Sequence, residues 1–222
     1  CGPACISLCQ DIQGQTFEYP EEFFKERIHS IRRPRPDDFQ IKEAAEKIKK
    51  SKNPIIISGG GVFYSNAMEE LSNFAIKHNI PVTQTVMGYS TMKRDHSHYA
   101  GQIGGLGGKN TNDLAKETDL AIAVGTKLAD FTTGSWANFE NEKFKLVSIN
   151  VSRFDANKHL AQAVVGDAKV SLIELSKALG DWKVGDEWNE KSQRELKIWN
   201  EHIDKESAPT NQEVPSYVQV IG

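Results

Sequence analysis

Apolar residues along the chain follow two recurring patterns that indicate alternating strands and helices. Short continuous apolar runs, typical of strands buried on both faces of a sheet, occupy residues 54–58, 81–85, 119–124, 145–151 and 163–165. Between them, apolar residues recur at helical spacing over residues 39–48, 65–78 and 109–116, and again at Leu172, Leu175 and Leu179. This alternation predicts an α/β fold over residues 37–182: a doubly wound, Rossmann-like parallel sheet with helices on both faces.

The segment before this domain has a weaker pattern. Residues 3–8 have the composition of a β-strand, and we expect residues 1–16 to be the tail of a preceding domain. Residues 17–36 are predicted to be a solvated linker, because Pro34 and Pro36 cannot continue a helix and favour extended backbone.

The segment after the domain is mainly polar. Residues 183–213 predict a helix with a sparse apolar face, followed by a second linker. Residues 214–222 resemble the first turns of another helix, with Pro215 near its start. A strand with nothing before it to pair with and a helix of about two turns suggest a segment of a longer protein, so residues 214–222 are expected to begin a following domain.

Composition narrows the possible partners. The 222 residues carry a net charge of −3, so no overall positive field attracts nucleic acid. The longest apolar run is about five residues, whereas a membrane-spanning helix needs roughly 20. The three cysteines, Cys1, Cys5 and Cys9, have neither the number for a disulfide framework nor the spacing of a zinc site. We therefore expect reduced thiols in a cytoplasmic protein that binds neither nucleic acid nor membrane.

Two glycine-rich turns are candidates for a ligand cleft. Gly59, Gly60 and Gly61 follow a predicted strand, and a second group, consisting of Gly104, Gly105, Gly107 and Gly108, precedes a predicted helix. Glycines at such a turn let the backbone approach a phosphate group, but they also occur in tight structural turns. Tyr64 stands where the dinucleotide fingerprint requires its third glycine, so a firm cofactor site is not predicted.

A loop after the strand at residues 119–124 offers candidate substrate contacts. Thr132, Thr133, Ser135 and Trp136 could bind a polyhydroxylated ligand, or the hydroxyls could instead hold the loop together through bonds to its own backbone. The sequence nominates no catalytic acid–base pair. It also predicts no metal site, since His96 and His98 form the only close histidine pair.

These segments together resemble the central domain of thiamine-diphosphate enzymes of the acetohydroxyacid synthase type. The similarity lies in Gly2-Pro3, in Arg35-Pro36, in residues 53–61 and in residues 123–128. Four further segments are similar to the trihydroxycyclohexanedione hydrolase family of myo-inositol catabolism: residues 19–24, 32–36, 130–136 and 150–159.

The resemblance implies a hydrolase that uses thiamine diphosphate and Mg²⁺ to break a ring C–C bond of a cyclic diketone, releasing a deoxyglucuronic acid. It also implies that a preceding pyrimidine-binding domain and a following diphosphate-binding domain of the same chain hold this cofactor, and that the full-length protein is a homo-oligomer. The Gly-Asp-Gly motif of the family is absent here, because Gly166-Asp167 is followed by Ala168. The segment itself is thus expected to be structural, with no cofactor, no FAD and no catalytic residue of its own.

Two other interpretations remain open from the sequence. One is the central domain of an acetolactate synthase-like carboligase, and the other is a stand-alone nucleotide-binding Rossmann module. The loop at residues 131–136 argues against the carboligase, and the incomplete fingerprint around Gly59 argues against the nucleotide-binding module.

Overall fold

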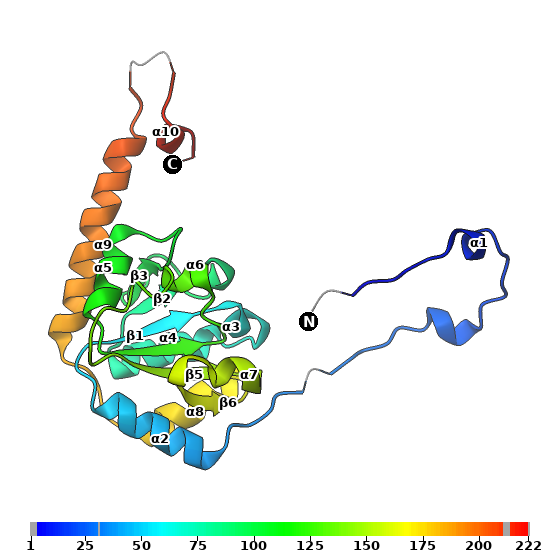
Figure 1. Cartoon of the computed structure of the whole chain (residues 1–222), viewed down its shortest axis with the longest axis horizontal. Helices are drawn as coiled ribbons and strands as arrows, with labels where there is room; N and C mark the ends of the chain where they lie inside the picture. Colours follow the sequence, from blue (N-terminus) through cyan, green and yellow to red (C-terminus); the bar gives the residue numbers. More distant parts are fainter. Residues whose placement is uncertain (1–3, 31, 211–213, 222) are drawn as a thin grey trace. The chain divides into compact units, whose positions relative to one another are not determined.

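The computed structural model describes residues 4–30, 32–210 and 214–221. It divides the chain into two units, Cys1–Arg32 and Arg33–Gly222. The second unit holds the sheet and most of the helices (Figure 1).

The second unit is built on a six-stranded, fully parallel sheet with the strand order β3-β2-β1-β4-β5-β6. The strands are β1 (Pro54–Ser58), β2 (Val82–Gln84), β3 (Tyr99–Gln102), β4 (Leu120–Val124), β5 (Lys145–Asn150) and β6 (Gln162–Val165). Every residue of β1 and β4, the two central strands, is buried, which accounts for their continuous apolar runs. The predicted α/β class and doubly wound parallel sheet are confirmed.

Helices cover both faces of this sheet. The helices of this unit are α2 (Asp38–Lys49), α3 (Gly60–Tyr64), α4 (Met68–His78), α5 (Lys109–Glu117), α6 (Asp130–Thr133), α7 (Arg153–Ala156), α8 (Ala168–Leu179), α9 (Asp186–Ser207) and α10 (Tyr217–Ile221), with short 3-10 turns η2 (Val86–Gly88) and η3 (Lys158–Leu160). The right-handed crossover from β1 to β2 contains α4, and the one from β3 to β4 contains α5. These two crossovers run in opposite directions along the sheet, so α4 and α5 lie on opposite faces. Helix α8 packs against α2 and α4, whereas α9 packs against α5 and β3. None of the helices in the described residues is both long and apolar enough to cross a membrane.

Two details of this unit differ from the expectation. Strand β3 is an additional strand at the sheet edge, in a stretch that was expected to be only a glycine-rich passage. The single helix expected over residues 65–78 is two helices, because the chain turns between α3 and α4, where Asn66 has a φ of 52°. Asparagine tolerates this left-handed conformation better than most residues, so the break occurs there.

The first unit contains short helical turns and no strand among its described residues. The strand expected over residues 3–8 was a wrong prediction for residues 4–8, because no neighbouring strand pairs with them; residue 3 lies outside the described residues. The turns are α1 (Gln10–Gln13) and η1 (Glu21–Phe24). Around η1, Phe17, Tyr19, Phe23 and Phe24 contact one another with ring centroids 5.0–6.0 Å apart, although every one of these side chains is exposed.

Candidate functional site

A cleft lies at the carboxyl ends of β1 and β4, where the strand order reverses direction. In doubly wound sheets this switch point is the usual place for a ligand. The cleft has a volume of about 320 Å³. It is lined by Gly60, Gly61, Tyr64, Thr85, Val86, Met87, Gly125, Thr126, Lys127, Ala129, Phe131 and Thr132. Its walls therefore come from the residues that follow β1, β2 and β4.

The first glycine group packs backbone against backbone. A Cβ on Gly59 would lie 2.5 Å from the carbonyl oxygen of Gly125, and a Cβ on Gly61 would lie 2.6 Å from the Gly125 Cα. The Gly59 amide donates to the Val124 carbonyl at 2.9 Å, and the Gly61 amide donates to the Gly125 carbonyl at 2.9 Å. These glycines let the turn after β1 rest directly on the turn after β4.

The second glycine group packs against the loop that contains α6 and against its own neighbours. A Cβ on Gly104 would meet the Phe131 carbonyl oxygen at 2.2 Å. Asn112 accepts a hydrogen bond from the Gly104 amide at 2.9 Å, and the amides of Gly105, Gly107 and Gly108 donate to backbone carbonyls. A phosphate bound at such a turn needs free amide donors, whereas the amides of these four glycines are paired within the protein.

The candidate substrate-binding residues of the loop at residues 131–136 lie in different environments. Thr132 lines the cleft, but the fully buried Thr133 hydroxyl donates to the Asp130 carbonyl at 3.4 Å and accepts from the Trp136 amide at 3.3 Å. Ser135 is exposed. Thr132 and Trp136 thus lie on the same loop, but the structure places only Thr132 at the cleft.

The indole of Trp136 has partners of its own. Its ring centroid lies 4.4 Å from that of His159 and 5.6 Å from that of Phe139. The side chain is half-buried and packs against the main hydrophobic core. Burial lowers the pKa of His159 below its ordinary value, and the nearby Lys158 lowers it further. Trp136 therefore anchors the loop to the hydrophobic core.

A larger hollow lies on the other side of the unit, between α5 and α9. Its volume is about 670 Å³, which makes it larger than the cleft at the carboxyl ends of β1 and β4. Charged residues of both signs line it, among them Lys109, Asp113 and Glu195. Burial raises the pKa of Glu195, while the ion pair with Lys191 opposes that rise.

The family assignment comes from comparison with known proteins. A model of the thiamine pyrophosphate enzyme central domain matches residues 41–175. The chain belongs to this family. The resemblance read from the sequence is thereby confirmed, and the six-stranded sheet is the core of a thiamine pyrophosphate enzyme central domain.

Two relatives of this central domain carry the same name. A protein from Clostridium perfringens (strain 13 / Type A), named 3D-(3,5/4)-trihydroxycyclohexane-1,2-dione hydrolase, is 41% identical over 202 residues, which cover 91% of this chain and 32% of the relative. A protein of the same name from Clostridium botulinum (strain Alaska E43 / Type E3) is 47% identical over 178 residues, which cover 80% of this chain and 28% of the relative. The chain thus spans about a third of the length of these curated relatives.

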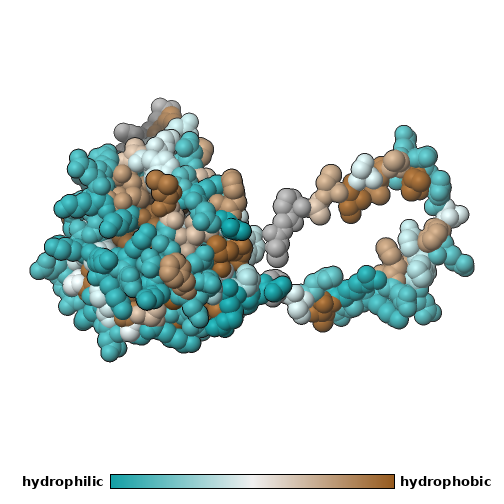
Figure 2. Space-filling model, turned by 60° about the horizontal axis from the view of Figure 1, so that its bottom comes forward, coloured by the Kyte–Doolittle hydropathy of each residue, from teal (hydrophilic) through white to brown (hydrophobic). Residues whose placement is uncertain are grey.

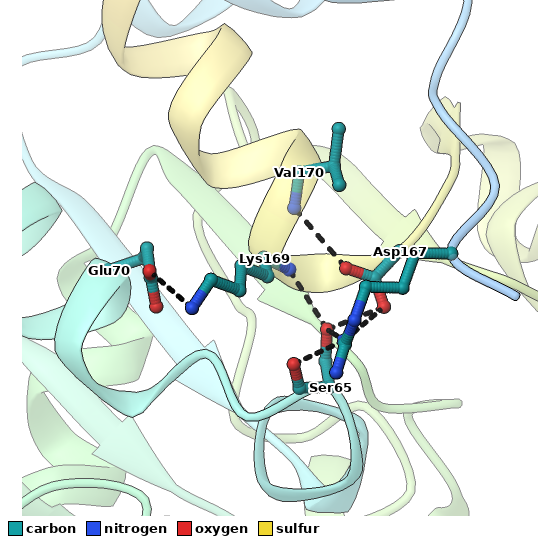
Figure 3. Close-up of polar contacts among 6 residues, drawn as sticks. Ser65, Glu70, Asp167, Lys169 and Val170 are labelled. Carbon is teal, nitrogen blue, oxygen red and sulfur yellow. Dashed lines mark hydrogen bonds and ion pairs between the residues drawn. The ribbon is translucent and has the colours of Figure 1, made fainter. Parts of the chain in front are cut away.

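The residues of the central domain do not fit a thiamine diphosphate–Mg²⁺ site. Asp167, in the Gly166-Asp167-Ala168 turn, is the residue that most resembles a metal ligand, but both of its carboxylate oxygens are in use. Oδ1 accepts from the Val170 amide at 3.3 Å, and Oδ2 accepts from Arg33 at 3.0 Å and from the Ser65 hydroxyl at 2.6 Å (Figure 3). Within the described residues, no group of three or more His, Cys, Asp or Glu side chains could hold a metal ion.

The same contacts correct the expectation of a fully solvated linker. Arg33 is half-buried and binds Ser65 as well as Asp167, and the Asp167 amide donates to the Pro34 carbonyl at 2.8 Å. Pro36 is buried. No local feature of the sequence predicts this packing, because Arg33 and Asp167 are 134 positions apart.

The polar network continues away from Arg33. The backbone amide of Lys169 donates a hydrogen bond to the Ser65 hydroxyl at 3.0 Å, and the Lys169 ammonium group forms an ion pair with Glu70 at 2.8 Å (Figure 3). The network therefore ties the start of α8 both to the segment before α2 and to the region of α3 and α4.

Proposed function

We propose that the chain is the central domain of a thiamine-diphosphate-dependent hydrolase that opens trihydroxycyclohexane-1,2-dione to a deoxyglucuronic acid in myo-inositol catabolism. The observation that carries this proposal is the 41% identity, over 91% of the chain, to the protein of that name from Clostridium perfringens. In the net reaction one water molecule is added across the ring C–C bond beside a carbonyl group: the carbonyl carbon becomes a carboxylic acid and the other carbon gains hydrogen.

In this proposal the central domain itself is structural and carries no catalytic residue. The paired amides of Gly59, Gly61 and the second glycine group support this assignment, as does the engaged Asp167 carboxylate, because these groups are not free to bind a cofactor. Thiamine diphosphate and Mg²⁺ are held by other domains of the longer protein. We also propose that the full-length protein is a cytoplasmic homo-oligomer that does not bind nucleic acid, in keeping with the net charge of −3.

The central test uses the full-length protein. Turnover of the cyclic diketone should require both thiamine diphosphate and Mg²⁺, and turnover in ¹⁸O-labelled water should place label in the carboxylate of the product. Pyruvate is the comparison substrate: condensation of pyruvate without diketone turnover would instead support the acetolactate synthase-like carboligase.

A second test addresses the role of the segment. Thiamine diphosphate with Mg²⁺, titrated into the 222-residue chain in a calorimeter, should give no saturable heat. Micromolar binding, or diketone turnover above the buffer blank, would mean that the segment contains a complete site and that the structural role is wrong.

A further inference from the structure

The connection between α8 and α9 is a short segment with a glycine at each end (Figure 1). We call residues 181–184 the strap; Gly180 precedes it with a φ of 65°, and Gly185 follows it. Apart from its chain neighbours, a Cβ added to either glycine would have no heavy atom of the described residues within 4 Å. The backbone at both ends of the strap therefore has room to change conformation, as the residues of a hinge do.

The strap is held at the carboxyl end of α4. The Val184 amide donates a hydrogen bond to the His78 carbonyl at 3.0 Å. Asn79, the left-handed C-cap of this helix, donates from its side-chain amide to the Val184 carbonyl at 3.1 Å and to Asp186 at 3.0 Å. The last residue of α4 and its C-cap thus fix the end of the strap and the first residue of α9.

The His78 side chain ties the strap to α8 as well. Polar residues cover most of the face of the second unit shown in Figure 2, whereas the His78 ring is fully buried. Its Nδ1 donates to the Trp182 carbonyl at 2.7 Å, and its Nε2 accepts from the Ser176 hydroxyl at 3.0 Å. A carbonyl only accepts, so the proton of the neutral ring is assigned to Nδ1. The neutral imidazole thereby joins α4, α8 and the strap.

Protonation of the ring disrupts this arrangement. Nε2 becomes a donor, so the Ser176 hydroxyl has to turn and accept a hydrogen bond instead of donating one. The ring also gains a positive charge in a buried position, which costs free energy unless an acidic group compensates it. Burial lowers the pKa of His78, the hydrogen bond to the Trp182 carbonyl opposes this effect, and the nearby Lys77 adds to it.

Among the described residues, the charged groups around His78 leave that positive charge uncompensated. Lys77, on α4, has the same sign as the protonated ring. Asp186 accepts its hydrogen bond from Asn79. His98, before β3, contacts Asn79 at 3.0 Å, and burial lowers its pKa as well. The charged side chains beside Ser176 and Trp182 are exposed to water, which screens them: Lys177 of α8, and Asp181 and Lys183 of the strap.

We propose that His78 is a pH-sensitive latch on the connection between α8 and α9: the neutral ring holds the strap closed, and protonation of the ring releases it. In the open strap the ring is hydrated and its pKa takes the ordinary value of about 6.5. The closed form therefore loses population to the open form as pH falls below about 6.5, by at most about tenfold per pH unit. The opening is local, because the buried Trp188 indole still donates to the Pro54 carbonyl at 2.8 Å and anchors α9.

Amide hydrogen exchange of the full-length protein tests the latch. Exchange is followed at about pH 7.5 and about pH 5.5, one unit above and one unit below the ordinary pKa of histidine, and each rate is compared with the intrinsic rate at that pH to give a protection factor. The Val184 amide reports on the strap, and the Ile56 amide of β1 reports on the core. Protection at Val184 should fall by up to about tenfold between the two pH values, and at both it should be lower than protection at Ile56.

Variants identify the group that titrates. His78→Gln removes the titrating ring but keeps a side-chain amide that can donate to the Trp182 carbonyl, so the pH dependence at Val184 should disappear. His78→Phe fills the same space without titrating and should give the same result. The matched control is His98→Gln, which removes a second buried histidine and should leave the pH dependence at Val184 intact.

Any of four results would overturn the latch. Two concern the unmodified protein: protection at Val184 that does not change with pH, and equal protection at Val184 and Ile56, which would mean that the strap opens only when the whole domain unfolds. The other two are a pH dependence that persists in both His78 variants and a pH dependence that is lost in His98→Gln. These measurements need no substrate, so their outcome is independent of the proposed reaction.

Discussion

Asp37 and Asp167 perform the same local task in very different surroundings. Each is the N-cap residue of a 12-residue helix, α2 for Asp37 and α8 for Asp167. The Asp37 carboxylate is exposed and accepts hydrogen bonds from the amides of Phe39 and Gln40. The Asp167 carboxylate is buried and accepts from Arg33 and Ser65 in addition to its capping bond. We predict that Asp167→Ala destabilises the domain much more than Asp37→Ala.

The expected difference follows from what each substitution leaves behind. Loss of an N-cap costs about 1 kcal/mol, which is the whole effect expected for Asp37→Ala. Removing one partner of a buried ion pair costs about 3–5 kcal/mol more. The Arg33 side chain is 34% exposed, so it can partly regain hydration after the loss of its partner. With that discount, the total for Asp167→Ala is about 3 kcal/mol.

Thermal and urea unfolding of the two variants provide the measurement. At roughly 2–4 °C per kcal/mol for a domain of this size, Tm should fall by about 2–4 °C for Asp37→Ala and about 6–12 °C for Asp167→Ala. Asp167→Asn should fall between them, because asparagine caps a helix well but cannot pair with Arg33. Equal losses for both alanine variants would show that the contacts with Arg33 and Ser65 contribute nothing, which would refute the reasoning.

Three further predictions concern a glycine, a histidine and a tryptophan. Gly61→Ala should cost about 1–3 kcal/mol in urea unfolding, because its Cβ would overlap Gly125, whereas Gly105→Ala should be nearly neutral because its Cβ meets only ordinary contacts. Burial lowers the pKa of His78, so the unfolded chain binds the proton more readily, and this residue should make stability fall as pH drops below about 6.5. Its own contribution is at most about 1.4 kcal/mol per pH unit, in addition to those of His96, His98 and His159, whose pKa values are also lowered. His78→Gln should reduce that slope in unfolding curves at several pH values. In the full-length protein, assayed on the proposed diketone substrate, Trp136→Ala should lower kcat/KM indirectly, because the indole packs under the loop that brings Thr132 to the cleft, while Tm falls by only a few degrees. A large loss of Tm with unchanged kinetics would show that the loop is structural.

The central part of the fold could be predicted because its signal is local. Strands β1 and β4 are buried on both faces, so their sequences are continuous apolar runs that no surface segment would carry. Helix α2 has an acidic N-cap and apolar residues at helical spacing, and both features follow from its own residues. For these elements, the pattern of apolar residues in the sequence matches the burial of those residues in the structure.

Strand β3 had no such signal. Its residues Tyr99-Ala100-Gly101-Gln102 contain no apolar run, and Gly101 has a φ of 107°, outside the normal range for a strand. The pairing of β3 with β2 also shifts register between Val82 and Thr83. The strand forms because the exposed edge of β2 offers hydrogen-bonding groups, a cause that lies in another segment of the chain.

The contacts of Asp167 could be predicted only in part. Its position after a buried strand and before an apolar-periodic helix indicates an N-cap. Nothing near it in the sequence identifies Arg33 as a partner, since that pairing depends on how the segment before α2 crosses the end of β6. The position of a charged side chain in a polar segment does not reveal whether the final fold covers it.

The position of the glycine turns in the sheet and the hydrogen bonds of their amides point to different functions. The strand order places the turns after β1 and β4 at the switch point, where related architectures bind nucleotides. A bound phosphate needs backbone amides that point into open space, yet Gly59 and Gly61 direct theirs to carbonyls of the adjoining turn. Met87 and Phe131 line the same cleft, and both side chains are largely exposed. The switch point therefore provides a cleft here, but the paired amides of Gly59 and Gly61 are not free to bind an anion.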